Sequence, residues 1–154
     1  MQTYFADYFS LLQTCHNDIH KALDGLPPET LDWSPGKDMN SISVLVVHLT
    51  GAERFWIGDV AAQEPSDRNR DAEFEVKGLG RDVLKKRLDD TLAYSKAALE
   101  KFTLQDLESP RRSPKTDREF TGGGSLLHAL EHATEHKGQI QLTRQLWEQK
   151  VNNS

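Results

Sequence analysis

Residues 126–139 read LLHALEHATEHKGQ, and they place three histidines, His128, His132 and His136, at intervals of four residues. In an α-helix each interval of four residues rises roughly 6 Å and turns by about 40°, so the three imidazoles form a slowly drifting row on one face. His128 and His136 then lie roughly 12 Å apart along the helix axis, which is too far for ligands of one ion. An adjacent pair can share an ion, and the spacing leaves His128/His132 and His132/His136 equally open. Either pair needs a third ligand from another part of the chain, because two imidazoles rarely hold a divalent ion tightly.

His48 is the candidate for that third ligand. Apolar residues recur with helical period over residues 41–62, which predicts a helix with Asn40 or Ser41 as its N-cap. His48 stands beside the apolar stripe of this helix. A histidine in such a position is either a hydrogen-bonded core residue or a ligand, and the histidine row elsewhere in the chain favours the ligand.

Three further segments have the same helical period: residues 5–26, residues 82–102 and the segment that begins near Ser125 and contains the histidine row. No segment alternates apolar and polar residues as a half-buried strand does. The sequence therefore predicts an all-α fold, a four-helix bundle with long crossover loops, formed by a single domain over residues 1–154.

Two polar segments are the predicted crossover loops. Residues 63–80 include four charged residues for which a solvated ion-pair network is expected, namely Arg68, Arg70, Asp71 and Glu73. Residues 109–124 end in three glycines, which resemble a phosphate-binding loop only superficially, because no strand precedes them and no Lys-Ser/Thr pair follows. We expect them to be a flexible entry to a helix that is N-capped by Ser125.

Composition excludes several classes of partner. The formal net charge is −5 and the basic residues are scattered, so nucleic acid is not an expected partner. No apolar run reaches membrane-spanning length, so no membrane association is expected either. The one cysteine, Cys15, rules out an internal disulfide and, together with a polar N-terminus, favours a cytoplasmic protein.

Cys15, His16 and His20 of the first predicted helix are not expected to take part in chemistry. Cys15 lies in the apolar pattern of this helix and is expected to be a small buried hydrophobe rather than a reactive thiol. His16 and His20 also stand four residues apart, but no third ligand follows at a matching spacing. We expect these two histidines to be solvated or at the edge of the core.

The chemistry of the histidine row depends on its neighbours. His132, Glu135 and His136 match the H-x-x-E-H signature of zinc peptidases, but those enzymes draw a further acidic ligand from well downstream, and few residues follow here. The match is interpreted as coincidental. Facing helices of a bundle commonly build metal sites, so His48 can meet two histidines of the row and form a three-histidine site with open coordination positions. Three neutral imidazoles suit zinc or nickel.

Several segments together resemble the DinB/YfiT family of metalloenzymes. They are WSP at residues 33–35, NSI at 40–42, VHL at 47–49, GAERFW at 51–56 and HATEHKGQ at 132–139. The match spans nearly the whole chain in the family's order. Its most specific part is a histidine on the second helix followed much later by H-x3-H-[K/R]-G-Q.

This resemblance implies a four-helix bundle, often a homodimer, that binds a divalent metal through His48, His132 and His136. It also implies that His128 is a cavity residue, because the family's ligands directly precede the K/R-G-Q tripeptide. Some relatives are transferases or isomerases that use low-molecular-weight bacterial thiols. The expected function is thus a metal-dependent thiol transferase or hydrolase that acts on a small-molecule substrate at an open three-histidine site.

The same residues also fit other functions. A helical metal-binding or interaction protein without turnover fits the same residues if the imidazoles hold a structural ion or only bond within the core. Gln139 is a candidate partner of a metal-ligating histidine, and Glu135 is a candidate general base. For Glu135 an exposed pair with Lys137, or with a neighbour of Arg144, is the favoured interpretation.

Overall fold

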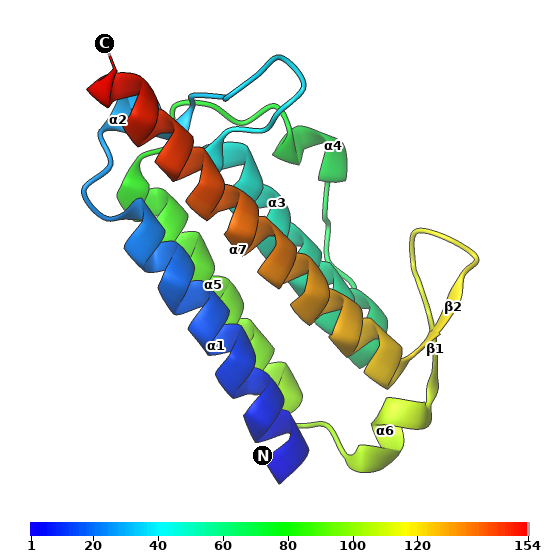
Figure 1. The fold of residues 1–154 in the computed structure, drawn as a ribbon. Helices are drawn as coiled ribbons and strands as arrows, with labels where there is room; N and C mark the ends of the chain where they lie inside the picture. The colour runs from blue at the N-terminus through cyan, green and yellow to red at the C-terminus, as the bar shows by residue number, and fades with distance from the viewer. Residues whose placement is uncertain (154) are drawn as a thin grey trace.

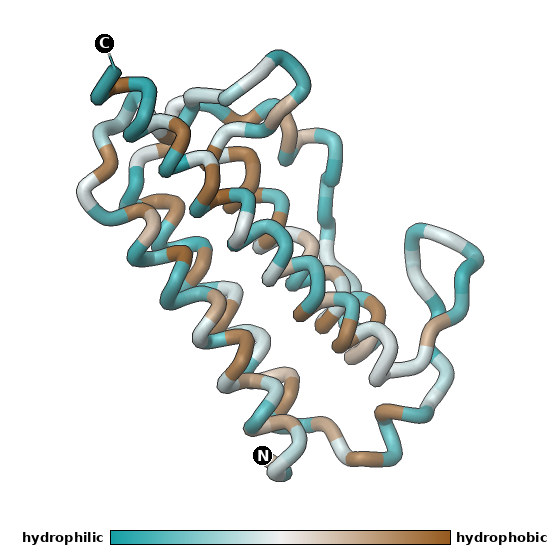
Figure 2. The backbone as a smooth tube through the Cα atoms, viewed as in Figure 1, coloured by the Kyte–Doolittle hydropathy of each residue, from teal (hydrophilic) through white to brown (hydrophobic). Residues whose placement is uncertain are grey.

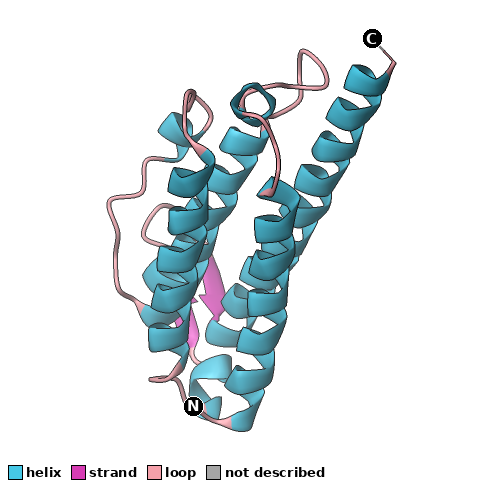
Figure 3. Ribbon diagram, turned by 90° about the vertical axis from the view of Figure 1, so that its left-hand side faces the viewer, coloured by secondary structure: helices cyan, strands magenta, loops and turns pink. Residues whose placement is uncertain are grey.

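The computed structural model describes residues 1–153, and four long helices form a bundle within this range (Figures 1 and 3). The helices are α1 (Thr3–Leu23), α3 (Ile42–Arg54) with its continuation η1 (Phe55–Ala62), α5 (Arg81–Leu99) and α7 (Gly122–Asn152). Each lies where the sequence has a helical period. The predicted all-α four-helix bundle is confirmed.

The connections give the bundle its topology. Helices α1 and α7 run in one direction, and α3 and α5 run in the other (Figure 1). Helix α3 packs against α7 and α5, and α1 packs against the same two helices, so α1 and α3 are diagonal to each other. The chain between η1 and α5 must return along the length of the bundle. This places residues of the return segment beside α3, where the site lies.

Hydrophobic residues recur along each long helix with hydrophilic residues between them (Figure 2). One contiguous core results, and its largest fully buried side chains come from all four long helices and from α2 (Pro28–Leu31). They are Phe5, Leu12, Ile19, Leu23, Leu31, Ile42, Leu49, Ile57, Leu84, Leu88, Leu99 and Leu126. Of the two predicted N-cap residues of α3, Asn40 and Ser41, the structure has Ser41, whose Oγ accepts a hydrogen bond from the Val44 amide at 3.3 Å.

The start of α7 differs from the sequence prediction. The glycines are not a flexible entry but the first turn of the helix, which is capped by Thr121: its Oγ1 accepts from the Gly124 amide at 2.9 Å. The prediction of Ser125 as N-cap is therefore wrong. Gly122 is a glycine because α7 approaches α6 (Leu104–Glu108) closely at this residue: a Cβ on Gly122 would lie 2.1 Å from the Asp106 carbonyl oxygen. Ser125 is buried instead, and its hydroxyl donates to the Trp56 carbonyl at 2.6 Å.

Short elements occupy the two crossover segments. Helix α4 (Arg70–Glu73) lies in the first, and an antiparallel hairpin of β1 (Pro110–Arg112) and β2 (Glu119–Thr121) lies in the second. No alternating pattern in the sequence predicted this hairpin. Helix α4 and the hairpin stand off the same side of the bundle, beside α3 and η1 (Figure 1). They form the outer wall of the cavity described below.

The second half of the helix predicted over residues 41–62 is wound as a π-helix, η1, which ends at Gln63 in the left-handed conformation with φ of 55°. A Cβ on Gly58 would lie 1.7 Å from Arg54 Nη1, because the Arg54 guanidinium folds back along η1 to bond Asp59 at 2.9 Å. π-helical segments are rare and frequently lie at functional sites. Here η1 carries Trp56, which lines the same cavity.

Within residues 1–153, none of the helices combines the length and the apolar character needed to cross a bilayer.

Candidate metal centre

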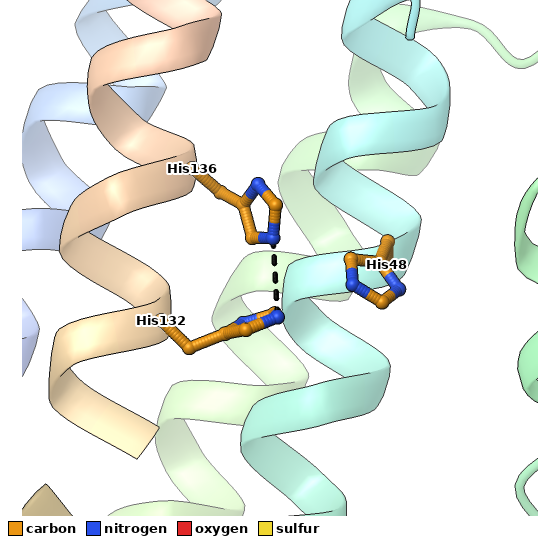
Figure 4. A group of neighbouring side chains, drawn as sticks. All are labelled: His48, His132 and His136. Atoms are coloured by element: carbon orange, nitrogen blue, oxygen red, sulfur yellow. Dashed lines mark hydrogen bonds between the residues drawn. The ribbon is translucent and has the colours of Figure 1, made fainter. Parts of the chain in front are cut away.

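His48 on α3 and His132 and His136 on α7 converge between the two facing helices (Figure 4). One donor nitrogen from each ring lies within 4.8 Å of the others. The Nε2 atoms of His132 and His136 are 3.1 Å apart, and the His48 ring centroid is 5.0 Å from that of His132 and 5.1 Å from that of His136. The structure thus brings together the three histidines that the resemblance singled out.

The distance between the His132 and His136 donors fits a tetrahedral ion. Two imidazole nitrogens bound to one zinc lie about 3.3 Å apart, given Zn–N bonds of about 2.05 Å and tetrahedral angles. The 3.1 Å between His132 Nε2 and His136 Nε2 is close to that value. Without an ion, one of these two nitrogens must donate a hydrogen to the other, and an ion would take the place of that hydrogen.

His128, the first histidine of the row, lies outside this group. Its ring centroid is 6.1 Å from that of His132 and 4.3 Å from that of Trp56, against whose edge it packs. His128 lines the cavity beside the three histidines. Spacing alone left the choice of pair open, and the packing of α7 on α3 brings His132 and His136, not His128, to His48.

A buried carboxylate holds His48. The Nδ1 of His48 lies 2.8 Å from Glu73 Oε2, and because a carboxylate only accepts, Nδ1–H is the donor. This tautomer leaves Nε2 with its lone pair, as a metal ligand requires. Arg68 holds the carboxylate in turn, with Nε 2.6 Å from Oε1 and Nη2 2.8 Å from Oε2. Glu73 is only 6% exposed, so the prediction of a solvated network is wrong for Glu73 and Arg68.

The electrostatics of Glu73 follow from these contacts. Burial alone would raise the pKa of its carboxyl, but the hydrogen bonds from Arg68 and His48 outweigh burial and hold the pKa below its usual value. The carboxylate is therefore ionised where His48 needs an acceptor. Gly51 of α3 makes this approach possible, because a Cβ there would lie 2.2 Å from Glu73 Oε1.

A polar chain on α7 orients His136. Its Nδ1 lies 2.7 Å from Gln139 Oε1, and the amide nitrogen of Gln139 donates to Glu135 at 3.3 Å. Since the amide group faces Glu135, the Gln139 oxygen accepts from His136 Nδ1–H and leaves His136 Nε2 with its lone pair. Gln139 thus has the contact expected of a partner to a ligating histidine. Glu135 pairs with Gln139 and not with Lys137, whose ammonium lies 3.6 Å from Asp18.

Burial keeps two of the histidines neutral. Desolvation, followed by the neighbouring His136 and His48, lowers the pKa of His132 to about 3. Desolvation also lowers the pKa of His136, against the opposing effect of its hydrogen bond to Gln139. A metal ligand must be deprotonated, so at neutral pH these rings are in the form that binds an ion.

A cavity of about 620 Å³ opens beside the histidines. His48, His132 and His128 form one end, Phe55, Trp56 and Phe120 supply aromatic walls, and α4 and the β1–β2 hairpin supply polar and basic residues. This volume lies within the range of about 300–1,000 Å³ that is typical of small-molecule sites. The histidine cluster is therefore accessible to a small molecule.

The remaining candidates of the sequence analysis lie elsewhere. His16 is buried, with 1% exposure, and its Nε2–H donates to Glu53 Oε2 at 2.6 Å, so the expectation of a solvated or edge position is wrong for it. His20 is partly exposed and pairs with Asp89 at 3.0 Å. Cys15 is buried as predicted, and burial raises the pKa of its thiol to about 11, which makes it a poor nucleophile.

Comparison with known proteins places the chain in a family. A sequence model of the DinB superfamily matches residues 11–140. A comparison with curated protein sequences found no match. Among solved structures, a conserved protein from Enterococcus faecalis matches with a TM-score of 0.77 and 16% identity, over 95% of this chain and 98% of that chain.

Two other structural relatives have descriptions that mention chemistry. YfiT from Bacillus subtilis, described as a probable metal-dependent hydrolase with an unusual four-helix bundle topology, matches with a TM-score of 0.66 and 15% identity over 91% of this chain and 87% of that chain. A mycothiol-dependent maleylpyruvate isomerase matches with a TM-score of 0.66 and 14% identity over 91% of this chain and 63% of that chain. At these identities the likeness shows a shared fold and nothing more.

Proposed function

The chain belongs to the DinB superfamily, and we propose that it is a metal-dependent enzyme whose divalent ion is held by His48, His132 and His136. The observation that carries the proposal is the convergence of three imidazole nitrogens within 4.8 Å, beside a cavity of about 620 Å³ that two of the three residues, His48 and His132, line. Three protein ligands and one open position are the mark of a catalytic zinc site. In the part of the chain that the structure describes, no further His, Cys, Asp or Glu joins the group. Zinc or nickel is the proposed ion, because neutral imidazoles suit both.

The proposed reaction class is thiol transfer or hydrolysis. A bound ion with an open position supplies a Lewis acid that lowers the pKa of a thiol or of water and so generates the nucleophile. The protein's own contribution is to orient the ligands: Glu73 aligns His48 and Gln139 aligns His136. Trp56 and Phe120 line the space in which a small-molecule substrate would lie. The descriptions of the hydrolase and the mycothiol-dependent isomerase among the structural relatives support this class.

The test begins with the metal content of the purified protein, followed by replacement of the ion with cobalt and addition of a small thiol. We expect about one ion per chain and a sulfur-to-cobalt charge-transfer band, because an open position exchanges its solvent ligand for the thiolate. Turnover is then sought with a panel of low-molecular-weight thiols and electrophiles. A cobalt spectrum that stays unchanged at saturating thiol, with four protein ligands resolved, would favour a structural ion without turnover.

Two further proposals rest on the family resemblance and on composition. We propose that the chain forms a homodimer, as the family resemblance implies, and that it works in the cytoplasm. Sedimentation at micromolar concentration tests the first proposal, and a monomer there would exclude it. Fractionation of the native cells tests the second, and recovery of the protein outside the cytoplasmic fraction would contradict it.

A further inference from the structure

Basic residues gather on one wall of the cavity. Four cations line it, Arg68 and Arg70 from the segment around α4 and Lys115 and Arg118 from the β1–β2 hairpin, against one acid, Asp71. These residues come from the two crossover segments that stand off the same side of the bundle (Figure 1). The chain as a whole carries a net charge of −5. The positive charge at the cavity is therefore a local feature that opposes the overall charge.

Three of these cations are not neutralised by the protein. The charge of Arg68 is neutralised by Glu73, because both Nε and Nη2 of Arg68 bond the Glu73 carboxylate. Among residues 1–153, by contrast, no carboxylate lies within 4.0 Å of the charged groups of Arg70, Lys115 and Arg118, whereas the surface cation Arg144 pairs with Glu148 at 2.8 Å. The charges of these three side chains are thus available to a ligand.

The contacts that these cations do make leave most of their donors free. Lys115 Nζ donates to the Arg68 carbonyl oxygen at 3.1 Å, which brings the hairpin to the α4 segment. The guanidinium groups of Arg70 and Arg118 stack on aromatic rings, 5.0 Å from the Phe74 centroid and 5.4 Å from the Phe120 centroid. Stacking positions a guanidinium but leaves its N–H groups free to bind an anion.

Part of the cavity wall is aromatic. Trp56 is central to it, with ring centroids 4.9 Å from Phe120 and 4.3 Å from His128, both in edge-on contact. Such a wall accepts the apolar or aromatic body of a ligand. A molecule that fills the cavity therefore meets basic groups, aromatic rings and two of the three clustered histidines, His48 and His132.

We propose that the cavity binds a small organic oxyanion, in which a carboxylate or phosphate group is held by Arg70, Arg118 and Lys115 and an apolar body lies against Trp56 and Phe120. This inference rests on the proposed function for what happens at the histidines, and it specifies the substrate class of that site. Planar guanidinium groups bind the two oxygens of a carboxylate or phosphate together, which is why arginine recognises such groups. The positive wall also attracts an anion to a chain that otherwise repels it.

The test uses three probes of similar shape: 2-naphthoate, 2-naphthyl phosphate and the uncharged 2-naphthamide. Their affinities for the metal-free and the zinc-loaded protein are measured by isothermal titration calorimetry, and zinc content is determined on the same samples. We expect at least one of the two anions to bind about tenfold more tightly than the amide in both forms, and the tighter of the two identifies the oxyanion. Raising the ionic strength should weaken the binding of the anion and leave the binding of the amide unchanged.

Variants of Arg70 and Arg118 test whether these residues cause the tighter binding of the anion. The double variant R70Q/R118Q should bind the preferred anion about tenfold more weakly. R70K/R118K should recover only part of that loss, because lysine retains the charge but not the planar group that binds two oxygens together. The matched control is Arg112→Gln, since Arg112 lies on the same hairpin, does not line the cavity and is 71% exposed. It should bind as the original protein does. All three variants alter exposed side chains, and thermal melting verifies that they fold.

The outcomes separate this inference from the proposed function. If the protein binds zinc but the anion and the amide bind equally, or if R70Q/R118Q binds the anion normally, the oxyanion site is refuted and the metal proposal stands. If the protein binds no zinc but prefers the anion in a way that depends on Arg70 and Arg118, the oxyanion site is supported and the proposed metal chemistry fails.

Discussion

Substitution of Gly51 by alanine tests how far the metal centre depends on the carboxylate behind His48. The added Cβ would lie 2.2 Å from Glu73 Oε1 and 2.9 Å from its Cδ. Ordinary contacts between such atoms need about 3.5 Å, so the carboxylate must move by roughly 1 Å. The bonds that hold it, 2.8 Å from His48 Nδ1 and 2.6 Å from Arg68 Nε, cannot both survive that movement. His48 then loses the acceptor that fixes its tautomer.

The expected magnitude is that of losing the partner behind a metal-ligating histidine. Such losses lower metal affinity by about 10–100-fold, which is about 1.4–2.7 kcal/mol. Glu73→Gln should have a similar effect without crowding Gly51, because an amide accepts less strongly than a carboxylate and can present its NH₂ group to His48. The free energy of unfolding is a poor readout for Gly51→Ala, because alanine in place of a helical glycine stabilises the helix by up to about 1 kcal/mol and so masks the damage at Glu73.

The assay is a competition titration of zinc between the protein and a chromophoric chelator at neutral pH. Gly138→Ala is the matched control: Gly138 also lies in a helix of the site, but nothing lies within 4 Å of the position of its added Cβ. It should bind zinc as the original protein does. The reasoning is refuted if folded Gly51→Ala and Glu73→Gln both bind zinc normally, or if Gly138→Ala loses as much affinity as Gly51→Ala.

Three further predictions concern the histidines and the whole chain. His132→Ala should reduce zinc affinity strongly and His128→Ala much less, as chelator competition would show; equal losses would contradict the proposed ligand set. In the metal-free protein, burial lowers the pKa of His132 to about 3 from an ordinary value near 6.5, so between these values the unfolded chain binds the proton more readily. The free energy of unfolding, measured with urea, should therefore be constant above about pH 7 and should decrease as the pH falls from about 6.5 towards about 3. The decrease should be smaller in His132→Ala, and an equal decrease in that variant would exclude His132 as the cause. If residues 1–154 are one domain, thermal unfolding followed by circular dichroism and by tryptophan fluorescence should give one coincident transition, and two separate transitions would contradict this.

Local patterns were sufficient for the framework of the site. The four helical stripes predicted the bundle because burial of one face is the main source of helix stability in a folded protein, and the period of that face is visible in the residues themselves. The four-residue interval between His132 and His136 places their rings on one helix face in any helix. The interval does not decide their close approach, because His128 and His132 have the same interval with ring centroids 6.1 Å apart, against 4.3 Å for His132 and His136. Helix ends were less well predicted, as the start of α7 at Gly122 shows.

Tertiary structure alone decided what surrounds the histidines. Glu73 and Arg68 lie in a segment without periodicity, and only the return of that segment along α3 buries them against His48. His16 on α1 and Glu53 on α3 form a buried pair for the same reason, because their side chains meet across the core between two helices that are diagonal in the bundle. The basic wall combines residues about 45 positions apart, such as Arg70 and Lys115, through the two crossover loops. Contacts of this kind depend on how the helices pack and where the loops close, and neither is encoded in the spacing of neighbouring residues.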